Sequence, residues 1–219
     1  PSGAIGWIVS EEAFMQPLRK VISKLKLRAS YGQVGNANLG GRRFAYLSTI
    51  TDDYETLNMY KWGLDSSYGL TGMAEGEFAV QDLTWEIVNK MNLGVELGFL
   101  NGMIDLQLDY FDERRKDIFM PRESVPMTAG FMKQPWKNFG KVTNQGVEVS
   151  LNVNKQFGKD LFVSLMGTFT YAHNEITEKD EPSAVVGTNR AETGHPVGQL
   201  TGYIAEGLFT ADDFEDVST

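Results

Sequence analysis

Paired carboxylates near the C-terminal end are the first side chains of this 219-residue chain that could do chemistry. Glu175 and Glu178, followed by Asp180 and Glu181, lie in a polar stretch at residues 173–198. Two carboxyl groups can serve as the acid and the base of a glycosidase. An acid catalyst needs surroundings that raise its pKa, and this stretch shows no sign of desolvation. We therefore interpret these acids as solvated loop residues and predict no catalytic residue and no enzyme activity.

Metal-binding residue types are present, but without the spacing of a metal site. Asp52, Asp53 and Asp65 offer the oxygen ligands that calcium prefers, yet they do not follow the pattern of an EF-hand loop. His173 and His195 stand alone, and the chain has no cysteine, so a zinc site is not indicated. We predict no metal ion and no cofactor.

The elements that carry these residues are predicted to be antiparallel strands. Residues 91–99 and 104–110 alternate apolar and polar side chains, which gives each segment one apolar face. Asn101 and Gly102 between them provide the positive-φ pair of a tight hairpin turn. Alternation also predicts strands at residues 25–31, 83–99, 103–115, 139–153, 161–171 and 200–209, a short hairpin over 44–50 and 56–62, and a helical turn within 10–24. A short apolar run at residues 4–9 is compatible with the end of a further strand.

Short and long connections alternate along the chain. The short links are residues 100–102 and 155–160, and the long ones are 35–82, 116–137 and 173–198. The link over residues 10–24 is of intermediate length and falls on the side of the short links. All long loops should therefore lie at one end of the sheet, which is the layout of outer-membrane barrels. Tyr31, Tyr110 and Tyr171 fall toward that end of the apolar face, where an aromatic girdle would lie.

Two all-β folds fit this pattern. A soluble β-sandwich, for instance a secreted glycan-binding module, also has alternating strands. Strand length favours a transmembrane β-barrel, because residues 83–99 and 139–153 exceed the usual strand of about 5–6 residues. In a barrel Val95 and Leu106 would face lipid. Asn89, Lys141 and Gln145 share that face, so they must lie beyond the lipid, or a bulge must switch the face.

The opposite face of these strands is charged. In a barrel it would line a wet lumen, with opposite charges pairing across strands, whereas in a sandwich it would be the ordinary solvated face. The residues on this face are Lys26, Arg28, Glu86, Lys90, Glu96, Asp105, Asp109 and Glu148.

Composition limits the class of protein. The formal net charge of -9 disfavours a nucleic-acid partner. No apolar run approaches the roughly 18 residues of a membrane helix. The chain opens at Pro1 in mid-pattern, with no signal peptide, and stops at Thr219 without a closing element, so we expect it to be part of a longer protein.

The motifs, taken together, resemble the SusC/RagA family of TonB-linked outer-membrane transporters. Any one motif is weak, but their order and spacing across most of the chain are specific. They are residues 25–36 (LKLRASYGQVGN), 83–86 (LTWE), 92–94 (NLG), 109–111 (DYF), Asn138, Gly140, Val142, Asn144, 146–148 (GVE), 194–196 (GHP), Gly202 and Tyr203. Residues 11–14 look like the periplasmic link of the family.

The resemblance implies a plugged barrel of about 22 strands, to which residues 1–219 would contribute about seven as part of the C-terminal barrel domain. The plug and the N-terminal domains, including the segment that contacts TonB, would lie outside this chain. The family imports oligosaccharides or peptides across the outer membrane of Gram-negative, Bacteroidota-like bacteria, with a SusD-like lipoprotein as a lid. The charged face would then meet the lumen or the plug.

Aromatic residues in the long loops are the candidate ligand contacts. Their rings could stack on sugars or dock the lid, but aromatics also pack within loops. They are Tyr46, Tyr54, Tyr60, Trp62 and Trp136.

Overall fold

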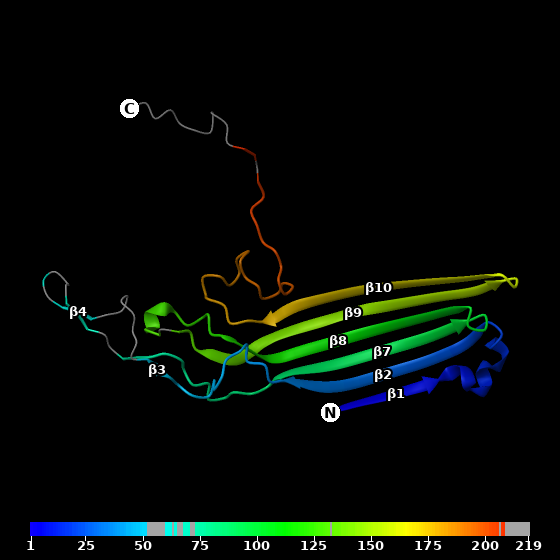
Figure 1. Cartoon of the computed structure of the whole chain (residues 1–219), viewed down its shortest axis with the longest axis horizontal. Helices are drawn as coiled ribbons and strands as arrows, with labels where there is room; N and C mark the ends of the chain where they lie inside the picture. The colour runs from blue at the N-terminus through cyan, green and yellow to red at the C-terminus, as the bar shows by residue number, and fades with distance from the viewer. Residues whose placement is uncertain are drawn as a thin grey trace.

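The computed structural model describes residues 1–51, 60–62, 64, 68–70, 73–131, 133–205 and 207–208. Its main element is a six-stranded sheet with the order β1-β2-β7-β8-β9-β10 (Figure 1). All neighbouring strands in it are antiparallel. The strands are β1 (Ser2–Ile8), β2 (Ile22–Asn36), β7 (Glu86–Phe99), β8 (Ile104–Pro121), β9 (Trp136–Phe157) and β10 (Leu161–Glu178).

The hairpin between β7 and β8 forms at the predicted place, but its loop has four residues instead of the two of the predicted turn. Phe99 pairs with Ile104, so residues 100–103 form the loop. Leu100 and Asn101 have φ values of 52° and 57°, and Gly102 follows at 83°. The left-handed conformation therefore begins at Leu100, where a residue with a Cβ adopts it only under constraint from the flanking strands.

The connections lie as predicted. Residues 9–21, 100–103 and 158–160 join strands at one end of the sheet, and the first of these links contains the 3-10 helices η1 (Val9–Glu11) and η2 (Ala13–Leu18). The loops over residues 37–85 and 122–135, the latter with η3 (Met127–Ala129), and the segment after β10 all start from the opposite end (Figure 1). We call the two ends the short-link end and the long-loop end.

The prediction of a last strand at residues 200–209 was wrong. Residues 200–205 and 207–208 form no strand, and Leu200, Tyr203 and Ile204 are 95%, 103% and 93% exposed. An alternating segment needs a neighbour that takes its backbone hydrogen bonds, and no described strand lies beside this one, so the sheet has six strands rather than about seven.

The predicted loop hairpin was also wrong. Residues 44–49 form turns and coil instead of a strand. The short pairs that do form join β3 (Ile50–Thr51) to β6 (Ala74–Glu75) and β4 (Tyr60–Trp62) to β5 (Tyr68–Leu70).

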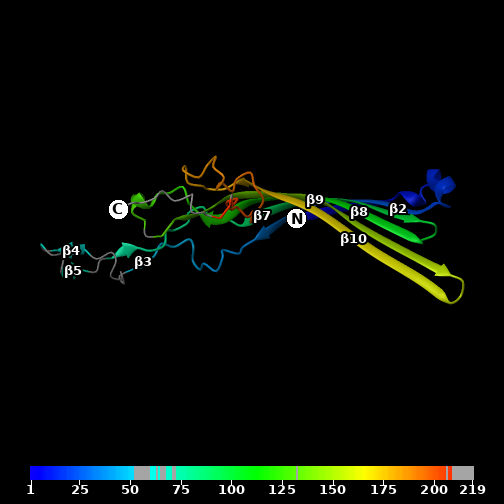
Figure 2. The same cartoon turned by 90° about the horizontal axis from the view of Figure 1, so that it is seen from above.

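The sheet is a single curved layer, and no second layer covers it within the described residues (Figure 2). Its apolar side chains stay accessible: Leu165 is 62% and Phe169 is 60% exposed. Among the described large side chains none is less than 2% exposed. The described part of the chain thus forms no sandwich, because a sandwich would bury one face of this sheet against another sheet.

Candidate functional site: the charged face and the long-loop end

The strand register places the predicted charged residues on one face. Arg28, Gly94, Asp109 and Glu148 pair in turn across β2, β7, β8 and β9, and we call such a line of paired residues a row. Side chains of one row share a face. Neighbouring rows on the same face hold Lys26 with Glu96, and Lys24 with Gly98 and Asp105. We call this side of the sheet the charged face.

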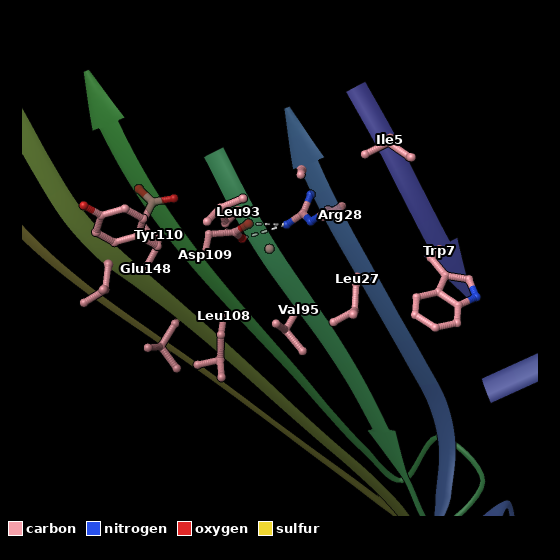
Figure 3. Close-up of a pocket in the computed structure, with 14 residues that line it drawn as sticks. Ile5, Trp7, Leu27, Arg28, Leu93, Val95, Leu108, Asp109, Tyr110 and Glu148 are labelled. Atoms are coloured by element: carbon pink, nitrogen blue, oxygen red, sulfur yellow. Dashed lines mark hydrogen bonds and ion pairs between the residues drawn. The ribbon is translucent and has the colours of Figure 1, made fainter. Parts of the chain in front are cut away.

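An ion pair that reaches over a whole strand ties this face together. The Arg28 guanidinium on β2 donates from Nη2 to both carboxylate oxygens of Asp109 on β8, at 2.7 Å each (Figure 3). Gln107 Nε2 donates to the same carboxylate at 2.8 Å. The Asp109 side chain is only 8% exposed, so its charge depends on these partners.

Gly94 on the intervening strand makes this ion pair possible. A Cβ at Gly94 would lie 2.5 Å from Asp109 Oδ1 and 2.7 Å from Arg28 Cγ, closer than real Cβ atoms approach other atoms. Glycine inside a strand often marks such a close approach. A glycine inside a strand was the only signal of this contact in the sequence, and it is weak. Neither the ion pair of Arg28 with Asp109 nor the role of Gly94 was predicted.

Further charge pairs extend along the same face. Glu96 accepts from Lys24 at 2.6 Å and lies 3.5 Å from Lys26, with 16% of its side chain exposed. Toward the long-loop end Lys90 pairs with Glu113 at 2.7 Å, and Arg115 pairs with Glu86 at 3.0 Å. Glu86 also accepts from Asn36 Nδ2 at 3.4 Å.

The β8–β9 side of the charged face carries excess negative charge. Glu148 lies directly opposite Asp109, and like charges at this position repel. Within the described residues neither Glu148 nor Asp105 belongs to an ion pair. These two carboxylates are therefore available to a cation from outside the sheet.

Among the predicted loop aromatics, the structure describes the side chains of Tyr46 and Trp136, and these two have different neighbours. Trp136 contacts the Phe119 ring, at 5.1 Å between centroids, and the Arg42 guanidinium, which lies 4.2 Å from its ring centroid. Both contacts occupy its ring, which favours packing over stacking on a sugar. Tyr46 contacts Phe44 edge to face and is 58% exposed. Tyr54, and the side chains of Tyr60 and Trp62, lie outside what the structure describes.

Of the two predicted acid pairs, Asp180 and Glu181 lie in the segment after β10, where they hold loops together, whereas Glu175 and Glu178 lie on β10 itself. The prediction of solvated loop acids was wrong for those two strand residues and for Asp180, which is only 7% exposed because loop residues surround it. Asp180 accepts hydrogen bonds from Arg122 Nε at 2.8 Å, Ser124 Oγ at 3.0 Å and the Ser124 backbone N–H at 3.2 Å. Glu181 accepts from the Glu192 backbone N–H at 2.6 Å and from Thr193 Oγ1 at 2.7 Å. We call the contacts of Asp180 the loop clasp.

The pKa of Asp180 is shifted in the direction opposite to the one that an acid catalyst needs. Burial raises the pKa of Asp180, but the hydrogen bonds from Arg122 and Ser124 outweigh burial and hold the pKa below its usual value. The same balance of burial against hydrogen bonds lowers the pKa of Glu181.

Acid should open the loop clasp. A carboxyl whose pKa is depressed on folding stabilises the fold above its unfolded pKa of about 3.9, and this contribution disappears as the pH falls through the folded value. We expect the Ser124 amide to keep its hydrogen-exchange protection above about pH 5 and to lose it in more acidic solution. In Asp180→Asn the protection should be low throughout and independent of pH. Full protection of the wild-type amide at about pH 1, below both pKa values, would contradict the clasp.

The described ranges contain neither a cluster of metal-binding side chains nor a helix able to cross a membrane. No three His, Asp or Glu side chains gather there so as to hold a metal ion. Asp52, Asp53 and Asp65, the calcium candidates, lie outside those ranges. No described helix is long and apolar enough to cross a bilayer.

Comparisons with known proteins agree with this architecture. The family described as "TonB dependent receptor-like, beta-barrel" matches residues 1–211. TonB-dependent receptor SusC of Bacteroides thetaiotaomicron is 34% identical over 181 residues, which are 81% of this chain and 17% of that protein. TonB-dependent receptor P39 of Formosa agariphila is 29% identical over 97% of this chain and 19% of its own length.

The fold has a solved counterpart. A chain in the structure of the RagAB peptide importer in the "closed-closed" state superimposes with a TM-score of 0.66 at 23% identity, over 89% of this chain and 20% of that one. This chain thus spans about a fifth of the length of the proteins it matches. With a family match over nearly all of its residues, the chain belongs to the TonB-dependent receptor β-barrel family.

Proposed function

We propose that the sheet is part of the wall of a transmembrane β-barrel, with its apolar side against lipid and its charged face toward a wet lumen. The uncovered apolar side carries this proposal. One of its rows runs Ala29, Leu93, Tyr110, Val147 and Tyr171, and the next Leu27, Val95, Leu108, Val149 and Phe169. Exposing apolar surface to water costs about 25 cal/mol per Å², a cost that lipid removes. We call this side the lipid face.

The tyrosines mark the edge of the apolar rows. The row of Tyr31 continues through Met91 to Asp112, Gln145 and His173, so the lipid face becomes polar at this level. Asn89 and Lys141 lie farther toward the long-loop end. Their polarity is therefore expected of residues beyond the hydrocarbon, and Tyr31, Tyr110 and Tyr171 lie where an interfacial girdle would.

The family to which the chain belongs supports a proposal for the domain that contains it. We propose that residues 1–219 form part of the C-terminal barrel domain of an outer-membrane transporter of about 22 strands. The plug and the segment that contacts TonB would belong to other parts of the protein. Lys26, Arg28, Glu86, Glu96, Asp105, Asp109 and Glu148 would face the lumen or the plug, where Glu148 and Asp105 suit a basic partner. The Bacteroides and Formosa relatives support an outer membrane of this bacterial group.

The cargo is proposed to be an oligosaccharide or a peptide, taken up with a SusD-like lipoprotein over the long-loop end. RagAB is described as a peptide importer, and SusC as a TonB-dependent receptor. Tyr46, with an exposed ring, and Tyr54, Tyr60 and Trp62 remain candidates for contact with cargo or lid. Trp136 is a weaker candidate because Arg42 and Phe119 occupy its ring.

Deletion of the gene tests this function. The strain without it should grow normally on glucose but fail on one class of a panel of oligosaccharides and peptides, and the intact gene should restore growth. A strain lacking TonB should show the same defect. Tagged full-length protein should sediment with the outer membrane and retain a lipoprotein on purification. A protein recovered from the soluble fraction would overturn the proposal.

A further inference from the structure

A polar hollow of about 450 Å³ lies in the segment after β10, at the long-loop end. It is lined by residues 190–192, 195–196 and 198–201, and its polar lining residues are Arg190, Glu192, His195, Gln199 and Thr201. Ligand pockets in proteins commonly have about 300–1,000 Å³. The hollow is therefore large enough for one terminal unit of a longer ligand.

Hydrogen bonds to β10 place this hollow at the rim of the charged face. The segment folds back along the edge of β10 that faces away from β9, where the Ile176 N–H donates to the His195 carbonyl at 3.0 Å. The Val197 N–H donates to Asn174 Oδ1 at 2.7 Å. Asn174 lies in the row of Lys90, so its side chain lies on the charged face. A ligand in the hollow would thus lie beside the entrance to the proposed lumen.

The wall of the hollow is held in place by its own hydrogen bonds. The Arg190 backbone N–H donates to Thr188 Oγ1 at 3.2 Å, and the Ala191 N–H donates to the Thr188 carbonyl at 3.1 Å. The next residue, Glu192, is fixed by Glu181 through its backbone N–H. The backbone that carries Arg190 is therefore ordered before any ligand binds, which lowers the entropic cost of binding.

Arg190 carries the uncompensated charge of the hollow. Glu192 is the one carboxylate among the lining residues, and its Oε1 accepts from Lys179 Nζ at 2.6 Å. Arg190 is exposed and belongs to no ion pair in the part of the chain that the structure describes. A guanidinium presents its N–H donors in a planar fork that matches the two oxygens of a carboxylate.

We propose that this hollow binds a carboxylate group of the cargo. Arg190 would donate two parallel hydrogen bonds to the carboxylate oxygens, while Gln199 and Thr201 would hydrogen-bond to the neighbouring amide or hydroxyl groups. The C-terminal residue of a peptide and a uronic acid of an oligosaccharide both offer this group. Neutral sugars and amidated peptides lack it. This inference rests on the proposed function, because it concerns the cargo of the transporter.

Calorimetric titration of the purified full-length transporter tests the hollow with two matched pairs of probes. One pair is trialanine and its C-terminal amide, and the other is trigalacturonic acid and its methyl ester. We expect wild type to bind at least one acid about tenfold more tightly than its neutral counterpart, equivalent to about 1.4 kcal/mol. The acid that binds identifies the source of the carboxylate. Arg190→Gln should remove this preference and leave binding of the neutral form unchanged.

Arg43→Gln is the matched control. Arg43 is a second exposed arginine at the long-loop end, where it lies over the Phe44 ring at 5.6 Å from the centroid, and it does not line the hollow. Its removal changes the net charge of the protein by the same amount as Arg190→Gln. A general electrostatic attraction would therefore weaken acid binding equally in the two variants, whereas the proposed site predicts a loss in Arg190→Gln alone.

Acid and neutral probes that bind alike to wild type, or no detectable binding of any of the four, would overturn the carboxylate site. Equal losses in Arg190→Gln and Arg43→Gln would do the same. The growth test of the deletion strain reports the proposed function separately. Restored growth with a transporter that shows no preference for carboxylates would therefore refute the hollow alone.

Discussion

Replacing Leu106 by arginine should lower the free energy of unfolding of the reconstituted barrel by about 2–4 kcal/mol, the cost of a cation on the lipid face near the bilayer midplane. Leu106 pairs with Leu97 and Leu151, so the guanidinium would enter a row of leucines. The measurement is urea unfolding of the full-length protein in lipid vesicles, followed by the gel mobility of folded and unfolded forms.

Ser150→Arg is the control at the same depth. Ser150 pairs with Gln107, the residue after Leu106, and therefore lies on the charged face. Arginine there can extend into the wet lumen, and we expect a change within about 0.5 kcal/mol, as at an ordinary surface site. Equal losses in both variants would show that the two faces do not differ in environment and would refute the assignment of lipid and lumen.

Removing the carboxylate of Asp109 should cost about 3 kcal/mol, at the lower end of what breaking a buried ion pair costs. Asp109→Ala leaves the Arg28 guanidinium and the Gln107 amide without their acceptor on a face where Asp109 is nearly buried. The lower end is appropriate because 35% of the Arg28 side chain is exposed and can be solvated. Urea unfolding of the reconstituted protein measures the loss.

The opposing carboxylate provides the contrast. Glu148→Ala removes a charge that faces Asp109 and belongs to no ion pair of the described residues, so stability should be unchanged or slightly higher. At Gly94, alanine should reproduce much of the Asp109→Ala loss by displacing Arg28, whereas Gly167→Ala should be nearly neutral. A loss in Glu148→Ala as large as that in Asp109→Ala would mean that the Arg28 bridge has no special role.

The alternation of side chains was sufficient to predict the faces of the long strands, and the loop lengths were sufficient to predict the two ends of the sheet. Both are local properties. The bridge from Arg28 to Asp109 could not be predicted in this way, because it depends on which residues of β2, β7 and β8 lie opposite one another. The odd or even position of a residue in a strand determines the face on which its side chain lies. Only the register between strands determines which residues lie beside it.

Residues 200–205 show that a local pattern can also predict a strand that does not form. Leu200, Tyr203 and Ile204 have the composition of a strand, but pairing requires a second strand, which local sequence cannot supply. The loop aromatics illustrate a further limit. Trp136 was chosen by residue type alone, and its role depends on Arg42, a residue 94 positions away in the printed sequence.

The tyrosines of the lipid face also report how the strands incline in the membrane. From β2 to β8, two strands away, the tyrosine position descends by one row, from Tyr31 to Tyr110, whereas Tyr171 on β10 lies in the same row as Tyr110. Between Tyr31 and Tyr110 this is a slip of about one residue per strand, the stagger that keeps aromatics at one depth when strands are spaced about 4.8 Å apart and inclined at 35–45°. The step from Tyr31 to Tyr110 is thus the stagger expected of inclined strands in a closed barrel.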